Sequence, residues 1–318
     1  MSASTAVVVA LAVILAYTFV GGGKAEGVVV LQSTLSAGSD PFTPSTATKV
    51  ESAVAHSTGP GASRADANRT GAVEVEGSHP GLYGGTQNAA SCDVEKQITF
   101  LTQNSDKGSA FAAVLGIQSA EIPAYLRSLL PARLSWDTRV TNHGYKDNEA
   151  TSYQAILQAG TPVLIDNRGV PRVRCACGNP LTPPAEVKGE QKFTGKQWSS
   201  FRPSGLVEIK PAEKPMKTVA MFDHDRKVWF ERSTGDVQGR HDHEVPPPKG
   251  QIPGSSYPTL PPADDGSVDE ESPGEEENED EGSTDEEKED QDKEKGKDEK
   301  KDEDKEDRDK EKGKDEKK

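Results

Sequence analysis

The sequence has few of the residues that build large hydrophobic cores. Only 32% of the 318 residues are hydrophobic and 5% are aromatic, well below the apolar content of an ordinary globular chain. We therefore expect one modest folded domain, flanked by long segments that bury no core. The chain has only three cysteines, too few for a fold held together mainly by disulfides.

An excess of positive charge is also missing. The net charge is −15, and residues 264–318 hold 29 of the 53 acidic residues but only 13 of the 38 basic ones. The rest of the chain is therefore nearly neutral. A nucleic-acid partner is not expected, because such a partner requires a basic surface.

Motifs of catalysis are absent as well. The chain has no P-loop, no dinucleotide fingerprint and no nucleophile elbow, so we expect no cofactor and no resident metal. Asp137 and His143 are weak candidates for an acid/base pair, near Tyr153. Residues 141–144 predict a tight turn, which Gly144 would permit. Whether the chain is an enzyme stays open, with a non-enzyme favoured.

One long apolar run is present near the amino terminus. Residues 5–23, which follow a short amino-terminal stretch at 1–4, are uncharged and as a helix would be about 28 Å long, enough to cross a bilayer. No Lys or Arg precedes the run, so charge does not orient it. It predicts either a retained transmembrane helix or a signal sequence cleaved near Gly23 and Ala25.

Composition divides the rest of the chain. Residues 24–80 are rich in Ser, Thr, Ala, Gly and Pro and predict a mostly disordered tether, although Val28–Leu31 are suited to a strand. Residues 81–235 hold all tryptophans and cysteines and predict the folded domain. A Pro-rich linker over 236–262 and a disordered acidic, Lys-rich tail over 263–318 follow. The cluster His241–Glu244 in the linker is expected to be solvated.

Hydrophobic periodicity predicts an α+β domain. Short amphipathic helices are expected near 94–101, 106–115 and 123–130. Ser91 and Asp93 are cap candidates for the first, Gly116 ends the second, and Pro123 lies in the first turn of the third. After Pro131 the period changes toward two, and antiparallel hairpins are expected over 162–174 and 218–230. Helices followed by hairpins are typical of an α+β fold rather than a parallel α/β sheet.

The three cysteines predict one disulfide. Cys175 and Cys177 stand two residues apart, and Cys92 is more than 80 residues upstream. A bridge from Cys92 to either one would stabilise the domain by about 4 kcal/mol on the chain-entropy model. We expect both to lie on one face of a strand, with Cys177 slightly preferred because it is nearer the turn at Gly178. The third thiol is then buried, able to exchange with the bridge, or paired between chains.

Seven short strings stand out along the chain. They are GVVVLQ and DPFTPSTA (residues 27–47), GLYGGT at Gly81, SCDVEK at Ser91, DTRVTNHGY at Asp137, LQAGTPVLID at Leu157 and RVRCACGNPL at Arg172. Together they resemble an uncharacterised actinobacterial family, typical of Streptomyces, of membrane-anchored proteins with one extracytoplasmic domain of unknown function. The resemblance covers about 27–235 and excludes the tail. It implies a cytoplasmic amino terminus and an outward-facing domain, but the basic or Pro-rich segment that usually precedes the family's membrane helix is absent here.

These observations predict a single-pass membrane protein whose extracytoplasmic domain is a non-catalytic binding or structural module of the cell envelope. Its expected partners are the membrane and a cell-wall polymer or envelope protein. Secretion after signal cleavage is the alternative location. A hydrolase using His143 with Asp137, or a thiol-based envelope sensor, is the alternative function.

Overall fold

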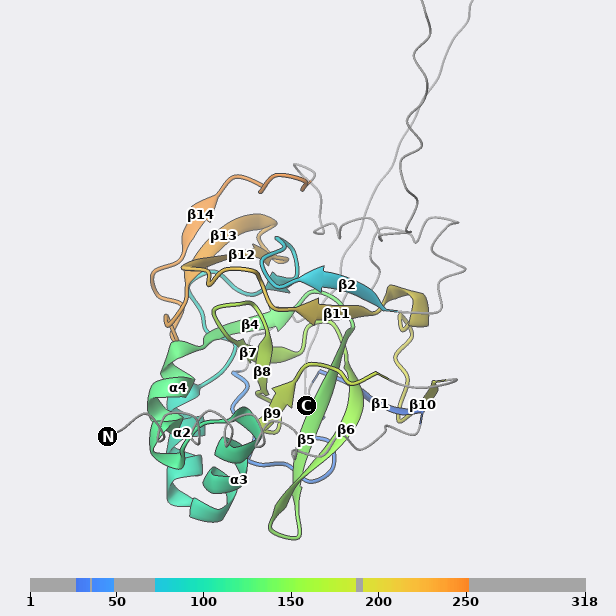
Figure 1. Cartoon of the computed structure of the whole chain (residues 1–318). Helices are drawn as coiled ribbons and strands as arrows, with labels where there is room; N and C mark the ends of the chain where they lie inside the picture. The colour runs from blue at the N-terminus through green and yellow to red at the C-terminus, as the bar shows by residue number, and fades with distance from the viewer. Residues whose placement is uncertain (1–26, 35, 49–71, 187–190, 252–318) are drawn as a thin grey trace, which may run out of the picture. The chain divides into compact units, whose positions relative to one another are not determined.

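The computed structural model describes residues 27–34, 36–48, 72–186 and 191–251 (Figure 1). The chain divides into two compact units, 1–265 and 266–318, and all described residues belong to the first. The expected membrane segment at 5–23 and the expected tail at 263–318 lie outside the described residues. None of the helices in the described ranges has the length and apolar character needed to cross a membrane.

The described residues form one mixed sheet of 14 strands, joined in the order β10-β1-β6-β5-β9-β8-β7-β4-β3-β12-β13-β14, with β11 bridging β5 and β2. The strands are β1 (Val28–Gln32), β2 (Val73–Glu76), β3 (Tyr83–Gly84), β4 (Leu130–Leu134), β5 (Thr138–Lys146), β6 (Glu149–Leu157), β7 (Pro162–Ile165), β8 (Pro171–Arg174), β9 (Asn179–Thr182), β10 (Lys192–Thr194), β11 (Val207–Lys210), β12 (Thr218–Asp223), β13 (Val228–Ser233) and β14 (His243–Val245).

Three α-helices occur in the described chain, and they confirm the three expected ones. They are α2 (Val94–Gln103), α3 (Ser105–Leu115) and α4 (Ile122–Ser128), the last preceded by the 3-10 turn η2 (Ser119–Glu121). Asp93 caps α2 by accepting the N–H of Lys96 at 2.9 Å. Gly116 ends α3 at a φ of 68°, a left-handed conformation that favours glycine. A second 3-10 turn, η3 (Pro203–Gly205), precedes β11.

The expected α+β class is wrong, because the fold is predominantly β. The hairpins β7–β8 and β12–β13 occur as expected. The sequence did not reveal five parallel pairings, namely β1 with β6 and β10, β11 with β2 and β5, and β12 with β3. Parallel partners come from distant parts of the chain, so local periodicity carries no signal for them.

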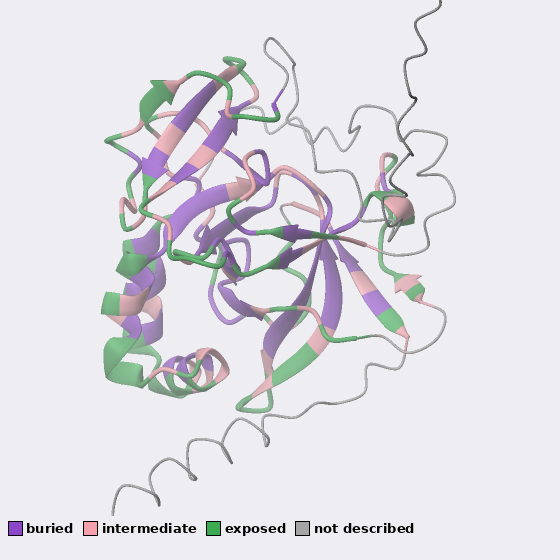
Figure 2. Ribbon diagram, turned by 45° about the horizontal axis from the view of Figure 1, so that its top comes forward, coloured by how far each residue is buried: buried purple, intermediate pink, exposed green. Residues whose placement is uncertain are grey.

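The sheet separates two hydrophobic cores, as alternation along β7 illustrates. Val163 and Ile165 face a core lined by the strands, whereas Leu164 faces the helices. The helices therefore cover one face of β7 and β8, and the opposite face contributes to the larger core. Figure 2 shows buried residues concentrated in the strands and along the inner sides of the helices. A third, smaller cluster joins β1 and β6 to Phe201 and Leu206.

Residues on both sides of the expected 81–235 domain belong to the described fold. β1 lies between β10 and β6, β2 pairs with β11, and β14 pairs with β13. Phe42 is fully buried and its ring meets that of Phe111 at 6.0 Å. The expected tether thus supplies strands and core residues within 27–34, 36–48 and 72–80, while 35 and 49–71 lie outside the described residues.

The tight turn expected at residues 141–144 is wrong, because all four residues lie within β5. The chain reverses later, at Asp147 and Asn148, whose φ angles of 51° and 65° suit the two-residue turn between β5 and β6. Asn142 is fully buried, where its Nδ2 donates to Gln32 Oε1 at 2.6 Å and its Oδ1 accepts from Asn179 at 3.0 Å. These distant partners replace the local bonds of a turn.

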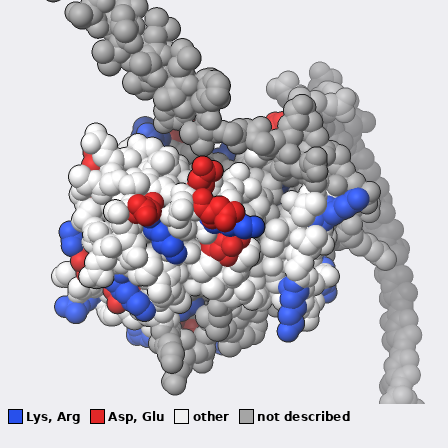
Figure 3. Space-filling model, turned by 90° about the horizontal axis from the view of Figure 1, so that it is seen from below, with Lys and Arg blue, Asp and Glu red and all other residues white. Residues whose placement is uncertain are grey.

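The surface carries both signs of charge. On the face seen in Figure 3, Lys and Arg side chains are spread singly over a mostly uncharged surface, and acidic side chains gather near its centre. Such a face forms no basic stripe of the kind that follows a nucleic-acid backbone.

Candidate functional site

Asp137 lies just before β5 and is almost fully buried. Its Oδ1 accepts the N–H of Ala159 at 2.8 Å, and its Oδ2 accepts the indole N–H of Trp198 at 2.9 Å. Burial raises the pKa of Asp137 to about 6, although both hydrogen bonds favour the ionised form. The carboxylate therefore links the end of β6 to the segment after β10.

His143 lies inside β5, opposite Ser152 of β6. Its Nε2 is 2.9 Å from the hydroxyl oxygen of Thr182 on β9. Burial lowers the pKa of His143 to about 4, so the imidazole is neutral near pH 7. It bridges two strands of the sheet.

The structure does not bring Asp137 and His143 together. They stand six residue steps apart along extended chain, which corresponds to about 20 Å. A general base must lie within hydrogen-bond reach of the group that it serves. Tyr153 does not complete a site either, because its hydroxyl accepts a hydrogen bond from Gln32 at 3.1 Å.

The cysteines form one disulfide, between Cys92 and Cys175, and leave Cys177 as a buried free thiol. The preference for Cys177 as the partner of Cys92 is wrong. β8 ends at Arg174, so strand alternation does not continue to Cys177. Cys175 belongs to the core under the helices, whereas the Cys177 sulfur is 3.5 Å from the Arg174 guanidinium.

Arg174 is fully buried, and no carboxylate pairs with it within the described ranges. Its Nη2 donates to the carbonyl oxygens of Ser33 at 2.8 Å and Ser36 at 2.5 Å, so it fixes the segment after β1. Burial raises the pKa of the Cys177 thiol more than Arg174 lowers it. Cys177 therefore stays protonated, which makes it a poor nucleophile.

The cluster His241–Glu244 is not fully solvated. The Asp242 side chain is fully buried in an ion pair with Arg232, which also donates to the carbonyl oxygen of Pro131 at 2.8 Å. His243 is 3.5 Å from Glu231, and His241 is 3.3 Å from Asp236. The described residues contain no group of three or more His, Cys, Asp or Glu side chains able to hold a metal ion.

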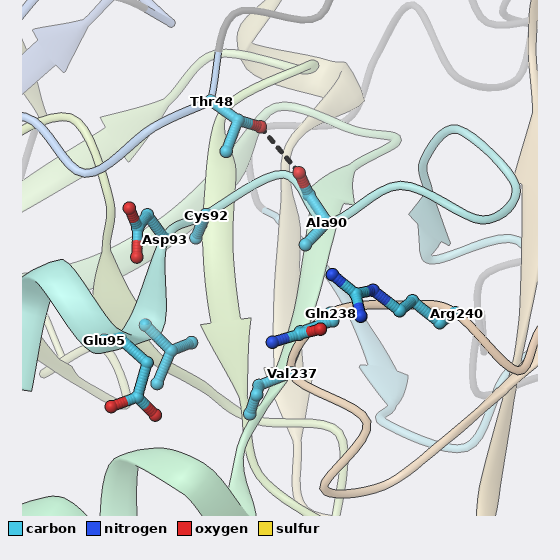
Figure 4. A pocket seen from close by; sticks show the side chains of 9 residues that line it. Thr48, Ala90, Cys92, Asp93, Glu95, Val237, Gln238 and Arg240 are labelled. Atoms are coloured by element: carbon cyan, nitrogen blue, oxygen red, sulfur yellow. Dashed lines mark hydrogen bonds between the residues drawn. The ribbon is translucent and has the colours of Figure 1, made fainter.

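A pocket of about 280 Å³ opens above Cys92, at the amino-terminal end of α2 (Figure 4). It is lined by Thr48, Ala90, Cys92, Asp93, Val94, Glu95, Val237, Gln238 and Arg240. Arg240 and Gln238 extend into the space in front of Cys92, while the carboxylates of Asp93 and Glu95 point away from the guanidinium. The pocket thus combines an apolar floor with hydrogen-bond donors at its rim.

These donors are available to a ligand. Glu95 pairs with Arg127 outside the pocket, at 2.7 Å, and Asp93 caps α2. In the described part of the chain no carboxylate is paired with Arg240. The arrangement suits a small ligand with an anionic group, since a guanidinium binds carboxylate or phosphate oxygens well.

No pattern in the sequence predicts this pocket. Val237, Gln238 and Arg240 fall in the expected linker, and that segment is held to the fold by the pairing of β14 with β13 and by the Arg232–Asp242 ion pair. The sequence predicts Asp93 as a helix cap and Cys92 as a disulfide residue, but neither as part of a pocket.

Comparison with known proteins gives a family but no activity. The model of a family described as Domain of unknown function (DUF6777) matches residues 73–235, just over half of the chain. No curated protein matches, and no solved structure matches. β1 and the segment 36–48 precede the matched range, and β14 follows it. On this match the chain belongs to the DUF6777 family, whose domain has no known function.

Proposed function

We propose that this chain displays a non-catalytic binding module on the outer side of a cell membrane, anchored by residues 5–23. The observation that carries the proposal is the disulfide between Cys92 and Cys175, both almost fully buried. Such bridges form and persist in oxidising compartments and are rare in the cytosol. The uncharged run at 5–23 supplies the means of retention.

The site geometry supports binding rather than catalysis. The candidate acid and base, Asp137 and His143, are buried and about 20 Å apart. In the pocket above Cys92, the Thr48 hydroxyl already donates to the carbonyl oxygen of Ala90 at 2.6 Å. Arg240 and Gln238 are groups that hold a ligand without reacting with it. The matching partner is an anionic group of a wall polymer or of an envelope protein.

The alternative functions have weaker support. A hydrolase would need Asp137 and His143 in contact. A thiol sensor would need an exposed thiolate, whereas Cys177 is fully buried with a raised pKa. Neither alternative uses the pocket.

Location is tested by a thiol map of the full chain recovered from membranes and from culture medium. Free thiols are alkylated in denaturant before non-reducing digestion, and the peptides are identified by mass. We expect the Cys92–Cys175 bridge, an alkylated Cys177, and an intact peptide from residues 5–23 in the membrane fraction. Alkylation of all three cysteines would place the domain in a reducing compartment and overturn the proposal. Recovery only from the medium, without residues 5–23, would favour secretion.

Binding is tested by retention of the full chain, in detergent, on isolated cell wall and on immobilised envelope proteins. We expect retention that Arg240→Gln weakens by roughly tenfold or more, because a hydrogen bond to a charged group contributes about 1.5–3 kcal/mol. Lys214→Gln is the matched control, since it removes the same charge from an exposed residue outside the pocket. Equal retention of both variants would exclude the pocket, and no retention on either material would contradict a binding role.

A further inference from the structure

The start of β1 lies very close to the expected membrane segment. The apolar run ends at Gly23 and β1 begins at Val28. Five residue steps of extended chain reach at most about 18 Å. A folded domain of about 200 residues is roughly 40 Å across, so this connection cannot hold the domain away from a bilayer.

β1 is firmly part of the fold. The connection between the apolar run and β1 therefore cannot become longer unless β1 separates from its neighbouring strands. It pairs with β6 over four residues and with β10 over three. Val29 is fully buried and Leu31 nearly so. The chain after β1 is held by Arg174 through the carbonyl oxygens of Ser33 and Ser36.

The end of the fold at which β1 begins has features suited to a bilayer surface. Val28 is 46% exposed, the one large hydrophobic side chain in the described ranges that is exposed. Exposed Lys192 is its partner on β10. Because β1 and β6 are parallel, the start of β6 and the hairpin turn at Asp147 extend beyond Val28 in the same direction. Val28 and Lys192 combine an apolar and a cationic side chain, which are favoured together at membrane interfaces, whereas the turn carries both signs of charge, with exposed Lys146, Asp147 and Glu149.

The carboxyl-terminal end of the described residues, at Gln251, lies in a different part of the fold from the start of β1. Gln251 donates from its side chain to the carbonyl oxygen of Pro80 at 2.9 Å. In Figures 1 and 2 this carboxyl-terminal stretch lies on the β12–β14 side of the fold, away from β1 and β10.

From this geometry we infer that the domain rests directly on the lipid bilayer that holds residues 5–23, with the start of β1, Lys192 and the β5–β6 turn against the lipid headgroups. The inference depends on the proposed membrane anchorage. It deepens the proposed function, because the pocket above Cys92 is then held at a fixed short height over the membrane rather than at the end of a long tether.

The test uses the full chain inserted into vesicles of phosphatidylethanolamine and phosphatidylglycerol that contain a lipid with a nitroxide on its headgroup. A fluorophore is attached to Lys192→Cys near the start of β1, or to Glu244→Cys on β14 as the matched exposed control. Native Cys177 is buried, and the unsubstituted chain measures the background labelling. We expect quenching several-fold stronger at position 192 than at position 244.

A second variant changes only the connection. A flexible Gly/Ser spacer of about 20 residues, inserted between Glu26 and Gly27, should reduce the quenching at position 192 to that at position 244. Equal quenching at both positions without the spacer, in a chain that remains in the vesicles, would overturn the inference and leave anchorage intact. A chain that does not associate with the vesicles at all would instead overturn the proposed anchorage.

Discussion

Two buried titratable side chains, Asp137 and His143, make the stability of the fold depend on pH in opposite directions. The pKa of Asp137 is raised by burial to about 6, from 3.8, so its contribution to stability is present at low pH and is lost as pH rises through 6. The pKa of His143 is lowered by burial to about 4, from 6.5, so its contribution is lost as pH falls through 4. Between about pH 4 and 6 the two effects oppose each other.

Single substitutions should therefore reveal slopes of opposite sign. Relative to the unsubstituted chain, His143→Gln should make the free energy of unfolding fall as pH rises from about 4 to 6. Asp137→Asn should make it rise over the same range. Each change is at most about 3 kcal/mol, at 1.36 kcal/mol per pKa unit. Urea unfolding at several pH values measures both, and parallel curves for the three proteins would refute the assignment.

The Arg232–Asp242 pair offers a second prediction at this scale. Both side chains are fully buried, so Asp242→Asn leaves a guanidinium uncompensated and should destabilise the fold by about 3–5 kcal/mol. Glu95→Gln breaks the pair with Arg127, where both side chains are 51% exposed, and should cost no more than about 1 kcal/mol. Thermal melting compares the two variants. Similar small losses would mean that Asp242 is solvated in solution.

At the scale of elements, the sequence predicted the helices and hairpins that are formed by residues close together in the chain. The three helices follow from apolar spacing, Asp93 and Gly116, and two hairpins follow from β-rich runs around short loops. The second half of β5 was missed because Asn142 and Gly144 are typical turn residues, and the partners of Asn142 lie 110 and 37 residues away. The pocket was missed because it needs the return of the chain after β13. Both β5 and the pocket depend on contacts between residues far apart in the chain. A short stretch of sequence carries no signal for such contacts.

The segment 36–48 provides a prediction about an element outside the matched family range. Phe42 is fully buried, and its ring lies 5.3 Å from that of Tyr145 and 6.0 Å from that of Phe111. Phe42→Ala should cost about 3–5 kcal/mol, as expected for a large buried aromatic side chain. Val28→Ala is the control, because Val28 is 46% exposed and its truncation should change stability by about 0.5 kcal/mol. Denaturant unfolding of the full chain tests both.

An unchanged midpoint for Phe42→Ala would mean that the family domain is complete without the amino-terminal segment. The expected loss would instead mean that the folding unit is larger than the matched range of 73–235. In that case the arrangement of β1 against β6 and β10 is part of the domain itself rather than of its attachment.

At the scale of the whole molecule, one disulfide cross-links the start of the helical segment to the sheet. Cys92 precedes α2, Cys175 follows β8, and 83 residues separate them. All three helices lie inside this loop. The bond thus limits how far the helical layer separates from β7 and β8 when the chain unfolds.

Loss of this bond should therefore lower the stability of the entire domain. Replacing Cys92 and Cys175 by Ser should reduce the free energy of unfolding by about 4 kcal/mol, because a closed loop of this length restricts the unfolded chain. Cys177→Ser, at a thiol that is free, should leave stability within about 1 kcal/mol of the unsubstituted chain, since it replaces one small buried group by another. Urea unfolding with and without reductant separates the two cases. Reductant should destabilise the unsubstituted chain and Cys177→Ser alike but leave the double variant unaffected, and a large loss in Cys177→Ser alone would show that Cys177 is bridged in solution.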